Sequence, residues 1–323
     1  MPVADSLPAL DPSCDGLHTA GADPWWREAW YFEFFDPQTK LQFQAYQGVF
    51  PNASAGDINA AVFHHGRRIH QLRKMDFHVL PEPASERLSF GPMKLEEIEP
   101  LQCWRIRYDA EEFSADLTFT AVHTPFSWAA AKLWMETSAD PDLDSHHFDQ
   151  LGRYEGKCWV DGQEISINTL GFRDRMWGWG GRKHWQSYLI MWAALSEDCV
   201  ANVALQRFDD GRATLSGYLH LDGKTSLLQQ ARAELEWHPI HWKCLANVNT
   251  TIEDSLGRKF QFSGQPGGIL DTGHRWPHRN DHMLFSVGEY HHRDLTGHGV
   301  MNWAFSTEED QLPVLEAQLE NAG

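Results

Sequence analysis

The segment from Gly171 to Trp185 combines residue types that could carry out acid/base chemistry. It runs Gly-Phe-Arg-Asp-Arg-Met-Trp-Gly-Trp-Gly-Gly-Arg-Lys-His-Trp, with one carboxylate, three arginines, three tryptophans and four glycines. Tryptophans form rigid apolar walls, and arginines stack on indoles or hold an oxyanion. We therefore take Asp174 as a candidate acid or base, and Arg175 and Arg182 as candidates for polarising a substrate oxygen. The alternative is a structural corner in which Asp174 belongs to an ion pair.

The protonation state of Asp174 depends on which neighbours it meets. A carboxyl group acts as a general acid at neutral pH only if its pKa is raised. Apolar Trp177 and Trp179 would raise the pKa of Asp174, whereas Arg173 and Arg175 would lower it. In a strand the two arginines point away from the face of Asp174 and need not contact it. Asp174 is thus either a proton donor or a residue that orients an arginine.

Two further residues are acid/base candidates. His147 follows another histidine and could act on a substrate, or it could be a surface or hydrogen-bonded histidine. Glu289 lies in the apolar run 284–290, where alternation places it on the face of Phe285 and Val287. It could therefore point inward or mark the exit of a strand into solvent. The expected apolar walls of a pocket are Trp177, Trp185, Tyr188, Tyr31 and Trp192.

No cofactor or metal is predicted from the motifs. His274, His278 and His282 recur at a spacing of four, but glycine and proline between them favour a loop, and no His-Glu-x-x-His pattern occurs. The sequence also lacks the glycine-rich phosphate-binding motifs and the Gly-x-Ser-x-Gly nucleophile elbow.

The elements that must position these residues are strands. Apolar and polar residues alternate with a period of two, which is typical of half-buried antiparallel strands, in residues 41–45, 104–108, 117–121, 215–221 and 231–237. Asp161-Gly162 and Asp222-Gly223 supply hairpin turns. About fifteen such runs occur, with weak helical patterns only at 126–136 and 308–321.

This pattern predicts an all-β fold of two tandem antiparallel barrels, because fifteen strands exceed one barrel of about eight. Residues 1–24 lack periodicity and are expected to form a disordered or draped arm. We predict an N-terminal barrel over residues 25–180 and a C-terminal barrel over residues 181–323. The run 185–192 is apolar on both faces, which favours burial at a barrel–barrel contact or in plain core.

Several segments resemble one family in order along the chain. Arg173-Asp174-x-x-Trp177-Gly178 resembles the Arg-Asp-x-x-Trp-Gly motif of the lipocalin-like superfamily that includes carotenoid 1,2-hydratases, AttH-type proteins and natural-product Diels–Alderases. Further matching segments are 28–32, 99–106, 147–153 and 297–300. The resemblance implies two calycin-type barrels with a reaction pocket at or between them. It also implies hydration, dehydration, isomerisation or cyclisation of a lipophilic, often isoprenoid, substrate without a redox cofactor.

Three positions depart from the hydratase pattern. Arg175 replaces a histidine, Asn302 replaces an acidic residue, and residues 202–204 lack the expected tyrosine and aspartate. The resemblance therefore implies the fold more directly than it implies the hydratase route to alkene protonation.

Composition excludes several other classes of protein. The 323 residues include 27 Lys+Arg and 45 Asp+Glu, a net charge of −18, which disfavours nucleic acids and anionic membranes. No apolar run reaches the roughly 20 residues of a membrane-spanning helix, and the N-terminus lacks the features of a signal peptide. Five cysteines without a Cys-x-x-Cys pair favour reduced thiols in the cytoplasm. The 15 tryptophans indicate an aromatic core or an aromatic-lined cavity.

The sequence therefore predicts a cofactor-independent lyase or isomerase. It would act on a lipophilic small molecule, of the isoprenoid type that the resemblance implies, by acid/base chemistry in an aromatic-lined pocket. The alternative is a carrier that binds a hydrophobic ligand without changing it.

Overall fold

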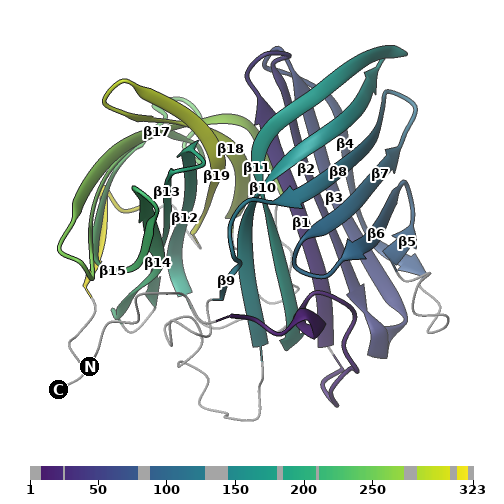
Figure 1. The fold of residues 1–323 in the computed structure, drawn as a ribbon, viewed down its shortest axis with the longest axis horizontal. Coiled ribbons are helices and arrows are strands. Elements are labelled where there is room, and N and C mark those ends of the chain that lie inside the picture. The colour runs from purple at the N-terminus through teal and green to yellow at the C-terminus, as the bar shows by residue number, and fades with distance from the viewer. Residues whose placement is uncertain are drawn as a thin grey trace. The chain divides into compact units, whose positions relative to one another are not determined.

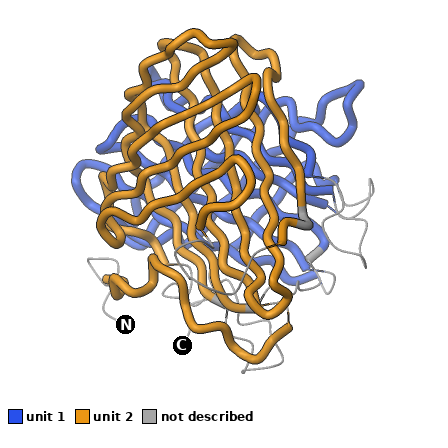
Figure 2. Tube along the Cα trace, turned by 90° about the vertical axis from the view of Figure 1, so that its right-hand side faces the viewer, with its two compact units in different colours: residues 1–7, 128–137, 183–323 blue, residues 8–127, 138–182 orange. Residues whose placement is uncertain are grey.

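The computed structural model describes residues 9–24, 26–78, 88–127, 145–179, 185–208, 211–272, 282–305 and 311–318. These residues are almost entirely strands (Figure 1). They divide into two compact units (Figure 2). The described part of unit 2 runs from 9 to 127 and from 145 to 179, and that of unit 1 from 185 to 318. In this part of the chain no helix has the length and apolar character needed to cross a bilayer.

Unit 2 is a curled antiparallel sheet in the order β4-β3-β2-β1-β11-β10-β8-β7-β6-β5, with β9 paired to β10. The two edge strands, β4 and β5, contact each other through side chains, since the ring centroids of Phe77 on β4 and Phe90 on β5 lie 5.5 Å apart. Its elements are η1 (Pro12–Cys14), β1 (Trp26–Asp36), β2 (Leu41–Phe50), η2 (Pro51–Ala53), β3 (Ala55–His64), β4 (Arg67–His78), β5 (Ser89–Phe90), β6 (Met93–Glu99), β7 (Cys103–Asp109), β8 (Phe113–Ala121), β9 (Phe126–Ser127), β10 (Ser145–Val160) and β11 (Gln163–Trp179).

Unit 1 is a closed barrel of eight strands. Its order is β14-β13-β12-β19-β18-β17-β16-β15, and pairing of β14 with β15 closes the ring, with β20 added to β15. Its elements are β12 (Trp185–Ser196), β13 (Cys199–Phe208), β14 (Ala213–Leu221), β15 (Lys224–Trp237), β16 (Leu245–Asp254), β17 (Lys259–Asp271), β18 (His282–His292), β19 (Leu295–Phe305) and β20 (Val314–Gln318). The predicted all-β fold with two tandem lipocalin-like barrels is confirmed.

The helical pattern at 308–321 does not produce a helix in the described residues 311–318. Val314–Gln318 is a strand that pairs with β15, and Leu315 is buried against the core of unit 1. The pairing supplies backbone hydrogen bonds and apolar contacts that a weak helical propensity cannot match.

Strand alternation separates two faces in unit 2. Trp30, Phe32 and Phe34 of β1 pack in the hydrophobic core. Tyr31 and Glu33 therefore lie on the opposite face of the same strand. This second face continues over strands β10, β11, β1, β2 and β3. We call it the polar face.

Gly48 on β2 is needed for packing on the polar face. A Cβ at this position would lie 2.1 Å from Asp57 Oδ1 and 2.3 Å from the Tyr46 hydroxyl. We expect Gly48→Ala to lower the free energy of unfolding by about 1–3 kcal/mol, because both polar groups must move. Urea denaturation measures this. Gly16→Ala is the matched control, since its Cβ would meet only the flexible Glu97 carboxylate at 3.3 Å. Equal losses in the two variants would contradict the explanation.

Candidate functional site

Asp174 and His147 form a pair on the polar face. They lie on neighbouring strands, Asp174 on β11 and His147 on β10, and His147 Nε2 is 2.9 Å from Asp174 Oδ2. His147 is buried, while the Asp174 side chain keeps 20% of its surface exposed. A carboxylate that contacts an imidazole fixes the orientation of the ring and stabilises its protonated form. The pair can therefore accept and return a proton.

Arg173 and Arg175 point to the opposite face, as strand alternation predicts. Both are fully buried. Arg173 forms a two-pronged ion pair with Asp15, with nitrogen–oxygen distances of 2.6 and 2.9 Å. Arg175 donates to Glu28 and to the carbonyl oxygens of Asp15, Gly16 and Met176. Neither guanidinium contacts Asp174 in these interactions.

These ion pairs hold residues 9–24 against one end of the unit 2 core. Asp15 also accepts hydrogen bonds from the Leu101 backbone N–H, at 2.6 Å, and from Trp104 Nε1, at 2.9 Å. Burial tends to raise the pKa of Glu28, but hydrogen bonds from His18 and Arg175 bring it below its usual value. A buried carboxylate that stays ionised needs such partners. The arginines of the motif thus have structural partners, and Arg175 has few donors left for a substrate.

Tyr31 and Glu33 join Asp174 on the polar face. Tyr31 on β1 lies directly opposite Asp174, which in turn lies opposite Asp149 on β10. Glu33 is two residues along β1 and only 1% exposed. Tyr31 was predicted to be an apolar wall of a pocket, and Glu33 was not among the predicted site residues. The signal for Glu33 was a charged residue inside a strand of large aromatic residues, which alternation places beside Tyr31.

Glu33 is a carboxyl group of the polar face with a large shift in pKa. Burial, together with the nearby charge of Asp174, raises the pKa of Glu33 well above its usual value, although hydrogen bonds with Tyr31 and Gln44 partly oppose this. Burial and the proximity of Glu33 likewise raise the pKa of Tyr31. These shifts favour the protonated, uncharged form of both groups.

The raised pKa of Glu33 predicts a pH-dependent effect of Glu33→Gln. The folded protein binds this proton more tightly than the unfolded chain, whose pKa stays near the ordinary 4.5. The contribution of this proton to the free energy of unfolding of the wild type is therefore largest below pH 4.5. It decreases as the pH rises toward the pKa of Glu33 in the folded state. The glutamine variant cannot ionise there, so its melting temperature should rise relative to wild type as the pH increases above about 4.5. The exposed Glu155→Gln is the matched control, and a constant difference for Glu33→Gln would contradict the prediction.

The other predicted site residues do not all join this pair. Trp177 lies on the core side of β11, stacked between His18 and His146 at ring distances of 4.4 and 4.8 Å. Tyr188 and Trp192 are buried on β12 of unit 1. Arg182 and the side chain of Trp185 lie outside the described residues, as do His274 and His278.

The Glu289 side chain is exposed to solvent. It belongs to β18 of unit 1, its side chain is 51% exposed, and it pairs with His291 and His298 at 3.1 and 3.4 Å. Its side chain is therefore turned toward solvent. Within the described ranges, no three His, Cys, Asp or Glu side chains are grouped as ligands of a metal ion.

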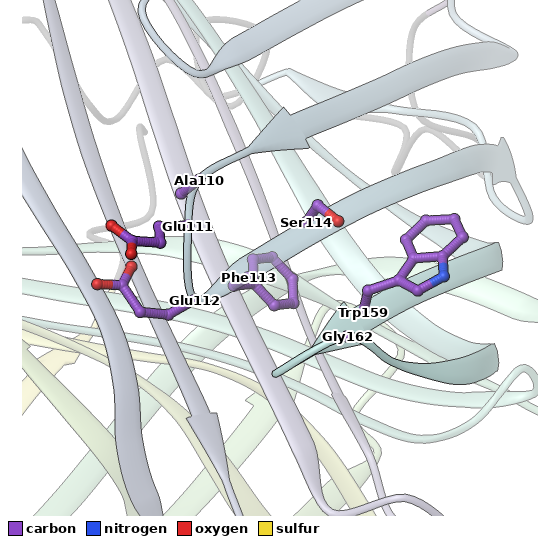
Figure 3. Close-up of a pocket in the computed structure, with 7 residues that line it drawn as sticks. All are labelled: Ala110, Glu111, Glu112, Phe113, Ser114, Trp159 and Gly162. Atoms are coloured by element: carbon purple, nitrogen blue, oxygen red, sulfur yellow. The ribbon is translucent and has the colours of Figure 1, made fainter.

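A separate hollow of about 470 Å³ lies at hairpin turns of unit 2. Figure 3 shows the carboxylates of Glu111 and Glu112 on one side, Phe113 in the middle and the Trp159 indole on the other side. Strand β11 begins at Gln163 beside this turn and reaches Asp174 eleven residues later, which is about 35 Å of extended chain. The hollow therefore lies far along the sheet from Asp174 and His147.

Known proteins share this fold. The sequence matches the family described as a domain of unknown function, DUF7064, over residues 11–307. A search of curated proteins gave no match. A putative AttH from Nitrosomonas europaea has a TM-score of 0.66 at 15% identity, covering 95% of this chain and 100% of its own.

Two further solved structures are similar. Kievitone hydratase from Nectria haematococca has a TM-score of 0.56 at 11% identity, covering 95% of this chain and 96% of its own. The structure of CghA with Sch210972 has a TM-score of 0.60 at 12% identity, and the match covers 95% of this chain and 98% of CghA. These structures confirm the predicted fold.

Proposed function

The chain belongs to the DUF7064 family, and from its lipocalin-like fold and its polar face we propose that it is a lyase or isomerase that uses acid/base chemistry on a small molecule. The proposal rests mainly on the contact of 2.9 Å between His147 Nε2 and Asp174 Oδ2. Asp174 lies directly opposite Tyr31, and the buried Glu33 is two residues from Tyr31 on the same strand. A similar fold in a protein named as a hydratase is consistent with this class of reaction.

The proposed base is His147. Its imidazole takes a proton from the substrate, and the Asp174 carboxylate stabilises the imidazolium that forms. The more exposed Asp174 is the member of the pair that a ligand reaches first. Because burial lowers the effective dielectric constant around His147, the attraction between imidazolium and carboxylate is stronger than in water.

The proposed acid is Glu33, which acts through Tyr31. Neutral Glu33 gives its proton to the Tyr31 oxygen as the Tyr31 hydroxyl gives its own to a leaving hydroxyl group or to a substrate carbon. His147 gains one proton and Glu33 loses one, so their charges balance within the site, and exchange with water restores both. If the leaving group is a hydroxyl, the reaction is a dehydration, and its reverse is a hydration. If the proton returns to another carbon, it is an isomerisation.

Arg175 takes a positioning role in this proposal. Its guanidinium links β11 to β1 through Glu28 and to residues 15 and 16 through their carbonyls. It therefore fixes the strands that carry Asp174 and Tyr31, and it does not contact the substrate. Glu289 has no role in the proposed reaction.

Native mass spectrometry of the purified protein, followed by incubation of the ligand it reveals, tests the proposal. We expect the ligand to gain or lose one water, or to rearrange at constant mass, at a rate above that of buffer alone. Chromatography with mass detection separates these products. A ligand that binds but emerges unchanged would contradict catalysis and support the carrier alternative.

A further inference from the structure

A continuous polar row crosses five strands of unit 2. In register, it runs from Asp149 on β10 through Asp174 on β11, Tyr31 on β1 and Tyr46 on β2 to Asn59 on β3. Directly opposite residues on antiparallel strands have their side chains on the same face and close together. The row therefore presents carboxylates, phenols and an amide side by side, and it includes both Asp174 and Tyr31 of the proposed reaction.

The neighbouring rows mix polar and apolar groups. One row continues from Leu151 and Phe172 to Glu33 and Gln44. All four residues are buried. The face thus offers an apolar patch beside a line of hydrogen-bonding groups. Its complement is a molecule with a carbon ring system on one side and oxygen atoms along the other.

Asn59 is the member of the row whose hydrogen bonds are missing. It is only 2% exposed, and neither its Nδ2 nor its Oδ1 has a hydrogen-bond partner among the described residues. An asparagine amide has two donor hydrogens and two acceptor lone pairs. Buried amides in folded proteins are almost always paired, and an unpaired one calls for a missing partner. A ligand oxygen is the partner that fits a residue in line with Tyr31 and Asp174.

We propose that the substrate is a polyoxygenated cyclic molecule and that Asn59 determines this specificity. This rests on the proposed function, because it places the substrate on the face of Asp174 and His147. The Asn59 amide donates to a carbonyl or hydroxyl oxygen of the substrate and accepts from a hydroxyl. A hydrocarbon substrate would leave this amide and its neighbours desolvated without compensation. The class therefore differs from the mostly apolar, isoprenoid substrate that the sequence predicted.

Unit 1 carries an independent example of the same feature. Asn202 on β13 is fully buried, and neither atom of its amide has a hydrogen-bond partner in the described part of the chain. It lies opposite Trp192 and Tyr218, on the face of its barrel that is turned away from the core. Unit 1 thus also contains an amide without a hydrogen-bond partner among the described residues, opposite two aromatic residues.

The first test needs no ligand. Asn59→Leu replaces an unpaired buried amide with an apolar group of similar volume, so we expect the melting temperature to rise by about 2–4 °C. Asn168→Leu is the matched control, because Asn168 is exposed on β11 and its side-chain amide forms hydrogen bonds with Arg153 and Glu155. We expect no rise there. A structural role for Asn59, including a bond to a buried water, predicts a fall in melting temperature, and that result would overturn the inference.

The second test compares two probes with one carbon skeleton. Resveratrol carries hydroxyl groups on its rings and trans-stilbene carries none. By calorimetry we expect resveratrol to bind the wild-type protein at least about tenfold more tightly, and Asn59→Leu to remove most of that preference. Equal binding, tighter binding of stilbene, or binding of neither would overturn the inference. This test measures binding alone, so its outcome does not depend on whether the protein is an enzyme. Catalysis is decided separately, by the mass change of the recovered ligand.

Discussion

Asp174→Asn should lower turnover of the recovered ligand by about 10²–10⁴-fold. The amide keeps the shape of the side chain and can still contact His147, but it carries no charge to stabilise the imidazolium. Single-turnover rates measure the effect, because they separate the chemical step from binding and release. The affinity for the ligand, followed by tryptophan fluorescence, should change far less than the rate.

The matched control is Asp116→Asn on β8. Asp116 is 41% exposed and pairs with Arg105 at 2.7 Å, so its loss should leave turnover close to that of wild type. His147→Gln should lower the rate to a similar extent as Asp174→Asn. The double variant should be little worse than either single variant, because the two residues act as one unit. Undiminished turnover in Asp174→Asn would refute the proposed base.

Arg173→Met should lower the free energy of unfolding by about 3–5 kcal/mol. The variant leaves the Asp15 carboxylate fully buried without its cation, and the Gln150 side chain also loses its donor. Denaturation in urea measures the loss. Arg105→Met removes the same type of side chain from the exposed pair with Asp116, and it should cost no more than about 1 kcal/mol.

A double variant separates charge burial from packing. Asp15→Leu combined with Arg173→Met removes both buried charges, so it should be more stable than Arg173→Met alone. A double variant that is less stable than Arg173→Met would contradict this explanation. The loss of stability in Arg173→Met would then come from lost packing and not from the unpaired charge of Asp15.

Much of the fold followed from local patterns. Period-two alternation and Asp-Gly turns predicted antiparallel hairpins, and the number of strands predicted two barrels. The same alternation correctly separated Asp174 from Arg173 and Arg175. The helical prediction was wrong at 314–318, because the pairing of β20 with β15 depends on a strand about 80 residues earlier in the chain and leaves no local pattern.

The candidate site was only partly predictable for the same reason. Asp174 and His147 are far apart in sequence, and their contact depends on the register between β10 and β11. The role of Arg175 depended on Asp15 and Glu28, which local patterns do not connect to it. Glu33 and Asn59 are polar residues in apolar strands, and only their burial in the folded protein sets them apart.

The pairing of β1 with β11 also determines when unit 2 can close during synthesis on the ribosome. Glu28 and Arg175 are 147 residues apart in the chain, so β1 emerges long before its second ladder partner exists. Until then one edge of β1 stays open, and the carboxylates of Asp15 and Glu28 remain in water. The first half of the chain therefore completes its fold only after β11 has left the exit tunnel, and nascent chains that stall earlier expose an aromatic strand to chaperones.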